Sequence, residues 1–288
     1  MLADTLSNFV GVFAAFVLGA SLCTLTEFLF ASEEQSAVSR VRGFFFSLIS
    51  LAAAVLATDL TKEFMAQAGL RPLIHWDLAS TIHSSNLFVV SAGYTVIPLC
   101  TVFLYDFGYY WFHRLQHTVP LLWRYHAVHH SIEELNSFNS YHHVSEYFFR
   151  IPLLTVPINL LFSISEPQVI VTGVIIGAVG KLAHANTRIC FGPLRYLFVE
   201  PRFHRVHHSV EERHWNRNYA FYFPLLDIVF RTAHFPSRNE CPRTGVNYAR
   251  EPRNLRMFLF PPEPPPEADA SREAALSAAE QPSTRYSA

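Results

Sequence analysis

Eleven of the chain's fifteen histidines lie between residues 113 and 208, and eight of these occur in three tight groups. The groups are HRLQH with His113 and His117, HAVHHS with His126, His129 and His130, and HRVHHS with His204, His207 and His208. Residues three or four positions apart share one face of a helix. Each group therefore predicts two or three imidazoles side by side on a helical face.

Eight imidazoles are too many for one tetrahedral zinc ion, and they suit two metal ions with four or five nitrogen ligands each. Imidazole binds zinc, copper, iron and nickel, so it does not select the metal. No HExxH occurs, and a zinc-protease site would therefore lack its general base. A haem held by two histidines would need them inside membrane spans, whereas these groups stand at the ends of spans. Four isolated histidines are interpreted as ordinary core or surface residues: His75, His83, His214 and His234.

The composition favours one membrane domain over two soluble domains. Of the 288 residues, 50% are hydrophobic and 16% are charged, and the mean hydropathy is +0.18. A net charge of −1 argues against a nucleic-acid partner held by phosphate contacts. The four cysteines are far apart and form no CxxC pair, so neither a disulfide framework nor a cysteine-based zinc site is expected.

Three apolar runs, at 8–30, 43–58 and 86–105, are long enough to predict membrane spans, and the third leads directly into His113. The mixed residues 59–85 are expected to form a loop with some interfacial helix. A further apolar stretch, 148–185, is interpreted as a hairpin that either crosses or re-enters the membrane. Both ends of the hairpin return to one side, which is expected to bring His143 and His184 close together. The sequence thus predicts an all-α polytopic membrane protein, with about four to five membrane helices or a re-entrant hairpin, and a helical cap that carries the histidines.

The placement of arginine predicts the orientation of these spans. Arginines occur in the loop at 31–42 and throughout the histidine-bearing segments, whereas residues 1–7 have no Lys or Arg. Because cytoplasmic loops are enriched in basic residues, the histidine site is expected on the cytoplasmic face. We divide the chain into N-terminal spans (1–94), a catalytic region (95–250, including the hairpin) and a Pro- and Ala-rich tail (261–288) that is expected to be disordered.

The motifs resemble those of the fatty acid hydroxylase superfamily, which includes sterol desaturases, sterol methyl oxidases, carotene hydroxylases and alkylglycerol monooxygenase. The resemblance covers roughly 95–235. The matching residues are Asp106, Tyr110, His113, Arg114 and His117 (D-x3-Y-x2-H-R-x2-H), His126–Ser131 (HxxHHS), His184 and Asn186 (H-x-N), and Pro201–Ser209 (P-x-x-H-R-V-H-H-S). An R-x-H-P-x-E element reads Tyr141–Glu146, without its Arg and Pro. An N-Y-G element reads Asn218, Tyr219 and Ala220, and a W-D element ends in Asp227 with the Trp lost.

The resemblance implies a non-haem diiron centre, with two iron ions, that uses O2 to hydroxylate or desaturate a C–H bond of a lipid. The implied metal ligands are His113, His117, His126, His129, His130, His143, His184, His204, His207 and His208. Asp106, Tyr110, Asn186 and Asn218 are expected at the catalytic site, and Asp106, Glu146, Asn186, Asn218 and Asp227 are expected to orient the histidine rings. No haem, flavin or nicotinamide motif is present, so electrons are expected from a separate ferredoxin or cytochrome and reductase system. The alternative is a non-catalytic membrane metal-binding or scaffold protein that retains the fold.

Overall fold

A computed structural model describes residues 2–76, 83–164 and 177–264. Three long helices dominate it: α1 (Leu2–Phe30), α2 (Ala37–Gln67) and α4 (Leu87–Thr118). By length and composition each of the three can cross a membrane. Large apolar side chains such as Leu18, Leu22 and Phe88 lie exposed along them, as expected for helices surrounded by lipid. The predicted all-α membrane architecture is confirmed in its main features.

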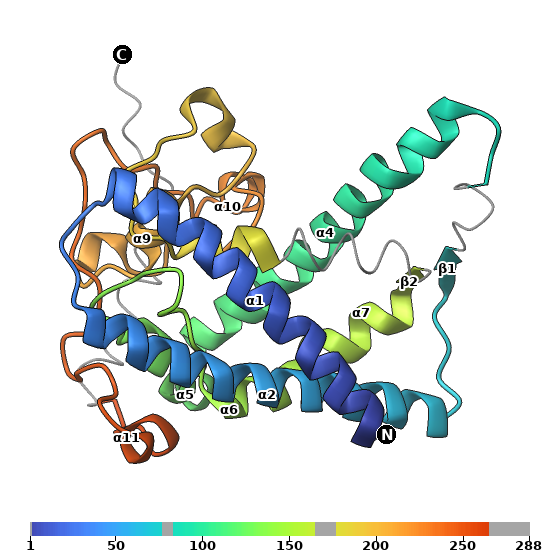
Figure 1. The fold of residues 1–288 in the computed structure, drawn as a ribbon, viewed down its shortest axis with the longest axis horizontal. Coiled ribbons are helices and arrows are strands. Elements are labelled where there is room, and N and C mark those ends of the chain that lie inside the picture. The colour runs from blue at the N-terminus through green and yellow to red at the C-terminus, as the bar shows by residue number, and fades with distance from the viewer. Residues whose placement is uncertain (1, 77–82, 165–176, 265–288) are drawn as a thin grey trace.

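The α1–α2 loop and the carboxyl end of α4, which carries the first histidine group, lie toward the same side of the molecule in Figure 1. A β-bridge between Ala31 and Thr187 ties the α1–α2 loop to the segment that follows the hairpin. The loop at 31–36 therefore lies at the same end as the histidines, as the span count predicted.

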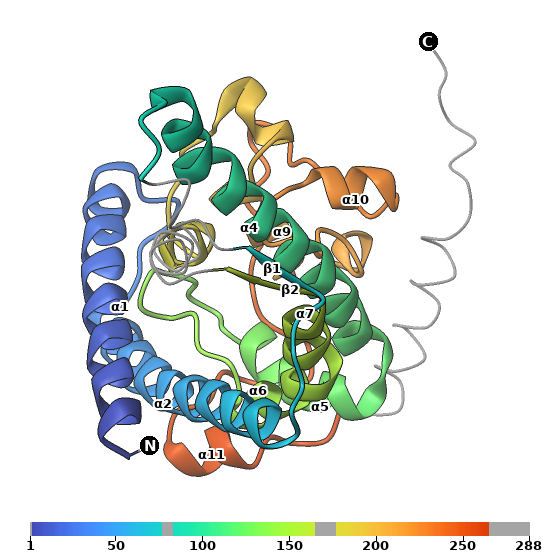
Figure 2. The same ribbon diagram turned by 90° about the vertical axis from the view of Figure 1, so that its right-hand side faces the viewer.

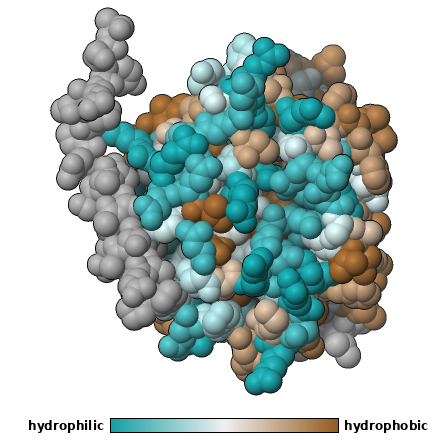
Figure 3. All heavy atoms as spheres, turned by 90° about the vertical axis from the view of Figure 1, so that its left-hand side faces the viewer, coloured by the Kyte–Doolittle hydropathy of each residue, from teal (hydrophilic) through white to brown (hydrophobic). Residues whose placement is uncertain are grey.

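Shorter elements form a cap at this end. They are α5 (Pro120–His130), α6 (Val144–Arg150), α9 (Pro201–His207), α10 (Leu225–Val229), α11 (Leu255–Leu259) and the 3-10 turns η2 (Gly192–Tyr196) and η3 (Glu212–His214). Hydrophilic residues cover most of the cap's outer face (Figure 3). Such a surface suits water rather than the bilayer core.

The end of α2 differs from the sequence-based prediction. α2 continues to Gln67, through part of the stretch predicted as a loop, and ends before Gly69, whose φ of +64° suits glycine. Beyond residue 250, α11 packs against α2. The rings of Phe46 and Phe258 stack with centroids 4.8 Å apart, and Arg42 forms an ion pair with Glu251. The predicted disordered tail lies outside the described residues from 265 onward.

The first arm of the predicted hairpin is helical for most of its length. α6 continues into a π-helical turn, η1 (Ile151–Thr155), and then into α7 (Val156–Leu161). Pro157 has no N–H to give to the preceding turn, which accounts for the irregular hydrogen bonding there. The arm ends in β2 (Phe162–Ile164), which pairs in parallel with β1 (Ile74–Trp76) (Figure 2). The tip of the hairpin lies outside the described residues, and a helical stretch at 177–183 leads back to the histidines.

Candidate metal centre

The histidine groups lie on the elements that their spacing predicted. His113 and His117 occupy the last turns of α4, and α5 carries the second group at its carboxyl end. α9 carries the third group, with His208 as its C-cap, and His184 follows the helical stretch at 177–183. All of these side chains are buried.

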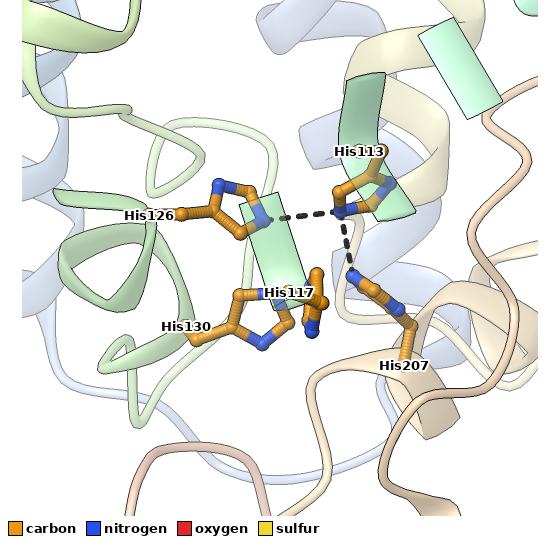
Figure 4. Close-up of side chains that lie close together, drawn as sticks. All are labelled: His113, His117, His126, His130 and His207. Atoms are coloured by element: carbon orange, nitrogen blue, oxygen red, sulfur yellow. Dashed lines mark hydrogen bonds between the residues drawn. The ribbon is translucent and has the colours of Figure 1, made fainter. Parts of the chain in front are cut away.

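Five of the imidazoles form one group, made of His113, His117, His126, His130 and His207. One nitrogen from each ring lies within 4.8 Å of the corresponding nitrogen of every other. Figure 4 shows the rings of this group pointing toward one another from α4, α5 and α9. This group of five therefore draws a ligand set from three separate helices.

Four further imidazoles form a second group under the same criterion, made of His129, His184, His204 and His208. The two groups adjoin, because the rings of His130 and His208 stack with centroids 4.5 Å apart. The structure thus brings nine of the ten predicted ligands into neighbouring groups of five and four, each of which could hold a metal ion.

Hydrogen bonds at Nδ1 determine which ring nitrogen carries the proton in the group of five. Nδ1 of His113 lies 2.8 Å from the Tyr219 carbonyl oxygen, and Nδ1 of His207 lies 2.8 Å from the Arg217 carbonyl oxygen. A carbonyl oxygen only accepts, so both Nδ1 atoms must donate, and both Nε2 atoms carry lone pairs. These two Nε2 atoms are 3.0 Å apart. Two lone pairs that face each other at this distance repel unless a cation lies between them.

The group of four shows the same arrangement. His129 and His184 direct Nδ1 at the carbonyl oxygens of Tyr141 and Gly180, at 2.8 and 2.9 Å, and their Nε2 atoms are 3.2 Å apart. Nitrogen ligands of a metal bonded at roughly 2.1 Å stand about 3 Å from one another. The Nε2 of His130 is buried without a hydrogen-bond partner among the described residues. The residues present therefore fit metal ions at both groups.

A shared proton does not explain these contacts. Burial, and then the neighbouring imidazoles, hold the pKa of His130 and of His208 well below the ordinary value of 6.5. Burial lowers the pKa of His207 to about 3, against the hydrogen bond to Arg217. The rings are therefore neutral at pH 7, which is the form that binds metal.

Glu146 is the carboxylate that orients a ring of the group of five. Its Oε2 lies 2.9 Å from Nδ1 of His126 and accepts a hydrogen bond from Nε2 of Gln116. Burial alone would raise the pKa of Glu146, but His142 and His126 hold it well below its ordinary range. A buried carboxylate hydrogen-bonded to Nδ1 fixes the orientation of the ring. It also makes the ring's other nitrogen, Nε2, a stronger electron-pair donor to a metal.

The other polar residues expected at the site act on the backbone instead. Asp106 accepts hydrogen bonds from the backbone N–H groups of Phe221, Tyr222 and Phe223. The hydroxyl group of Tyr110 contacts that of Thr232, at 2.9 Å. Neither side chain touches a histidine ring through these bonds. Asp106 and Tyr110 instead join α4 to segments that follow α9 and α10.

Asn186, Asn218 and Asp227 likewise hold segments in place. Asn186 exchanges two hydrogen bonds with the backbone of Glu33, which connects the α1–α2 loop to the segment after His184. Asn218, at φ +60°, donates to the carbonyl oxygens of Phe203 and His234. Asp227 accepts from the backbone N–H groups of residues 219 and 220. The last two residues thereby fix the loop whose carbonyl groups orient His207 and His113.

His143, the tenth predicted ligand, is not brought to either group. It is the N-cap of α6, where its Nδ1 accepts a hydrogen bond from the N–H of Ser145 and its ring lies against Tyr125 and Phe258. The neighbouring His142 is the one that reaches the centre, because its ring stacks on His129 with centroids 3.8 Å apart. The hairpin therefore brings His184, and not His143, to the histidine groups.

Several contributors were not predicted from the sequence. Gln116 holds Glu146, and the ring of Trp123 packs against His117 and His130. Glu27, within the first apolar run, is buried and accepts hydrogen bonds from the N–H groups of Ser137 and Asn186. The presence of a carboxylate within an apolar run was the feature of the sequence that could have indicated this role of Glu27.

His214 and His234, interpreted as ordinary residues, form a hydrogen-bonded cluster with Glu240 outside the two groups. Burial would raise the pKa of Glu240, but the Ser237 N–H and the two imidazoles lower it to about 2. The cluster fastens the segment after α10 to η3.

Comparison with known proteins identifies the segment that contains these groups. Residues 98–232 match the family model described as fatty acid hydroxylase. We refer to this matching segment as the fatty acid hydroxylase domain. The domain contains all nine clustered histidines together with Glu146. The resemblance inferred from the motifs is therefore confirmed.

Curated relatives of the fatty acid hydroxylase domain modify lipids, as their names indicate. The chain is 35% identical over 142 residues to an ornithine lipid hydroxylase of Rhizobium tropici, covering 49% of this chain and 43% of the relative. It is 32% identical over 154 residues to the alkylglycerol monooxygenase of Homo sapiens, covering 50% and 31%. A very-long-chain aldehyde decarbonylase of Oryza sativa subsp. indica is 30% identical over 140 residues, covering 44% and 22%. The chain thus spans less than half the length of these relatives. No solved structure matches it.

Proposed function

We propose that the chain is a membrane-bound, non-haem diiron oxidoreductase that uses O2 to hydroxylate or desaturate a C–H bond of a lipid. One observation carries the proposal: nine buried histidines form adjoining groups of five and four whose Nε2 lone pairs face one another at about 3 Å. The fatty acid hydroxylase domain and the lipid hydroxylase and monooxygenase among its relatives support it.

Iron is favoured over zinc because oxidation of a C–H bond needs a redox-active metal, and zinc has no redox chemistry. The group of five and the group of four would each hold one iron. When bound, the two irons would catalyse the oxidation of an unactivated C–H bond, and the reaction would consume O2 and electrons from an external donor.

The chain's own residues hold the rings and exclude water. Main-chain carbonyl groups and Glu146 fix the imidazoles from behind, and the burial of every clustered histidine keeps bulk water away. Because the ligands are neutral, few charges need to be desolvated at the membrane boundary. The lipid would reach the centre from the membrane side, where α4 and the 148–185 hairpin lie.

Electrons would come from a separate ferredoxin or cytochrome and reductase. The excess of arginine in the cap and in the loop at 31–42 supports a cytoplasmic location for the site, accessible to such donors. We keep the division into spans at 1–94 and a catalytic region at 95–250. Thiol labelling of a single cysteine introduced at Arg202, in intact cells and in inverted vesicles, tests the orientation, and labelling from outside intact cells would contradict it.

Metal content and turnover test the proposed function. The purified chain is expected to hold two irons and, with a reductase and a lipid extract, to consume NAD(P)H in an O2-dependent manner. The variant His129→Ala is expected to insert in the membrane and to lose turnover. Zinc alone after anaerobic iron loading, with no turnover, would contradict the proposal and favour the non-catalytic metal-binding protein. If turnover is observed, lipid analysis of a deletion strain would identify the substrate.

A further inference from the structure

A cavity of about 210 Å³ adjoins the group of four. Its walls come from α4, the end of α6, the stretch at 177–184 and the loop at 221–222. His184 and His142 line it, so the cavity reaches a clustered imidazole and the ring that stacks on His129. A substrate in this cavity would therefore lie directly against the proposed metal centre.

Lys181 is one of the two Lys or Arg residues among the described residues that line the cavity. Its ammonium group donates a hydrogen bond to the Ser140 hydroxyl at 2.8 Å and lies 4.0 Å from the centroid of the Phe16 ring. An ammonium group has three N–H donors, and the Ser140 hydroxyl is the one acceptor that the described residues give it. Donors therefore remain for a ligand in the cavity.

Arg150 is the second of these two residues. Its guanidinium carbon lies 5.3 to 5.7 Å from the ring centroids of Tyr109, Phe112 and Tyr147, and its Nε is buried without a hydrogen-bond partner among the described residues. Aromatic faces attract a cation but accept no strong hydrogen bond. The guanidinium fork is therefore held in position with its capacity for a planar anion unused.

The charge around the cavity is unbalanced. Among the residues that the structure describes, none that lines the cavity carries a carboxylate. The nearby carboxylate of Glu146 is already engaged by Gln116, His126 and His142. Arg150, and Lys181 in its protonated form, would repel metal cations bound beside them in a region of low dielectric. An anion in the cavity would remove this cost.

We propose that this cavity binds an acidic group of the lipid substrate, a carboxylate or a phosphate monoester, through Lys181 and Arg150. Lys181 stands three residues before His184, and Arg150 four residues after Glu146, so each cation lies about one helical turn from a residue of the metal centre. The carbon that is oxidised then lies within a few bonds of the acidic group. This inference rests on the proposed function, because it names the class of lipid that the same site would accept.

Ligand binding to the full-length, iron-loaded chain in detergent tests the inference without turnover. The probes are oleate and oleyl phosphate, with methyl oleate and oleyl alcohol as neutral partners, each measured by displacement of fluorescent cis-parinaric acid. The acidic probes are expected to bind more tightly than their neutral partners. Lys181→Met is expected to weaken the acidic probes by about ten- to a hundredfold, the value of a hydrogen bond to a charged group, and to leave the neutral probes unchanged.

Lys62→Met is the matched control, because Lys62 is the chain's other lysine and is exposed at the far part of α2. It is expected to bind all four probes like the wild type. Lys181→Arg should restore selectivity for acidic probes, which separates loss of charge from misfolding. Tighter binding of oleate than of oleyl phosphate would assign a carboxylate, and the reverse a phosphate. Equal binding of acidic and neutral probes by the wild type, or loss of iron from Lys181→Met, would overturn the inference. Selective binding without O2 consumption would instead contradict the proposed function.

Discussion

At the residue scale, the centre is defined by where each imidazole places its proton. Four of the nine clustered rings direct Nδ1 at a main-chain carbonyl oxygen, which leaves Nε2 to face the neighbouring rings. His126 differs, because its partner is the carboxylate of Glu146. Every residue has a main-chain carbonyl group, so the sequence does not reveal which carbonyl orients a ring. A carboxylate acceptor belongs to a side chain and can be removed by mutation.

Glu146→Gln is therefore expected to weaken metal binding at the group of five. The amide keeps the shape of the carboxylate but not its charge, so His126 becomes a poorer donor and Gln116 loses a charged acceptor. Loss of such a partner typically lowers metal affinity by about 10- to 100-fold. Titration of the metal-free chain with Fe²⁺ under anaerobic conditions measures this affinity. Glu263→Gln, at an exposed ion pair with Arg124, is the control and should bind like the wild type.

Substitution of His142 and of His143 tests which of the two supports the metal centre and which only caps α6. His143→Asn preserves a side-chain acceptor for the Ser145 N–H, and it is expected to retain both irons. His142→Ala removes the ring that covers His129 and a partner of Glu146, and it is expected to lower iron content or retention. Metal analysis after dialysis compares them. Loss of iron from His143→Asn alone would show that His143 is a ligand.

Helical spacing explains why eight of the nine clustered histidines could be predicted from the sequence. Three groups repeat at three and four residues, and a helix converts that spacing into one face whatever surrounds it. His142 and His143 lie where the chain is extended, and consecutive side chains there point to opposite sides. Spacing alone could not decide between them. Lys181 and Arg150 were also missed as a pair, because only the hairpin brings residues so far apart in the sequence to one cavity.

At the element scale, close approach of backbones sets the position of the cap on the spans. α2 crosses the loop that connects α5 to α6 at Gly43. A Cβ at Gly43 would lie 2.7 Å from the Cα of Asn139, which is backbone and cannot swing aside. This loop leads to Tyr141, whose carbonyl orients His129. The fit of α2 against the loop therefore supports the group of four.

Gly43→Ala is expected to destabilise the protein, because overpacking against backbone typically costs about 1–3 kcal/mol. Thermal unfolding in detergent, followed by circular dichroism, measures the loss, and iron retention is expected to fall with it. Gly11→Ala, in α1 with nothing within 4 Å of the added Cβ, is the matched control and should be neutral or slightly stabilising. Equal melting temperatures for the two variants would show that the loop can move to accommodate the added methyl group without loss of stability.

The elements were predictable where local pattern determines them. The apolar runs predicted α1, α2 and α4, and each of these helices is long enough to cross a membrane. The parallel pairing of β1 with β2 depends on residues 74–76 meeting 162–164, and no local signal marks such a contact. Asp106 and Asn218 were predicted to lie at the catalytic site and to orient the histidine rings. Their polar groups satisfy backbone N–H and C=O groups in the loop after α9, which a motif does not distinguish from contacts to a ring.

At the scale of the whole molecule, folding buries imidazoles that the unfolded chain would protonate. Burial, followed by the neighbouring imidazoles, holds the pKa of His129, His130, His204 and His208 well below 6.5, and burial lowers that of His207 to about 3. Between about pH 6.5 and 3 the unfolded chain therefore binds more protons than the folded chain. Stability must rise with pH through this window and fall as the pH decreases.

The chelated, metal-free protein is thus expected to lose thermal stability steadily as the pH decreases from 7.5 to 5. Each buried imidazole contributes at most about 1.4 kcal/mol per pH unit once the unfolded chain is protonated, so several together give a steep dependence. His207→Gln removes one such group and should make the dependence shallower, whereas His75→Gln, at an exposed position outside the centre, should leave it unchanged. Unfolding midpoints measured in one detergent across this range check the slope. A midpoint that does not change between pH 7.5 and 5 would mean that the folded protein accepts these protons, and the facing lone pairs would then be bridged by hydrogen rather than by metal.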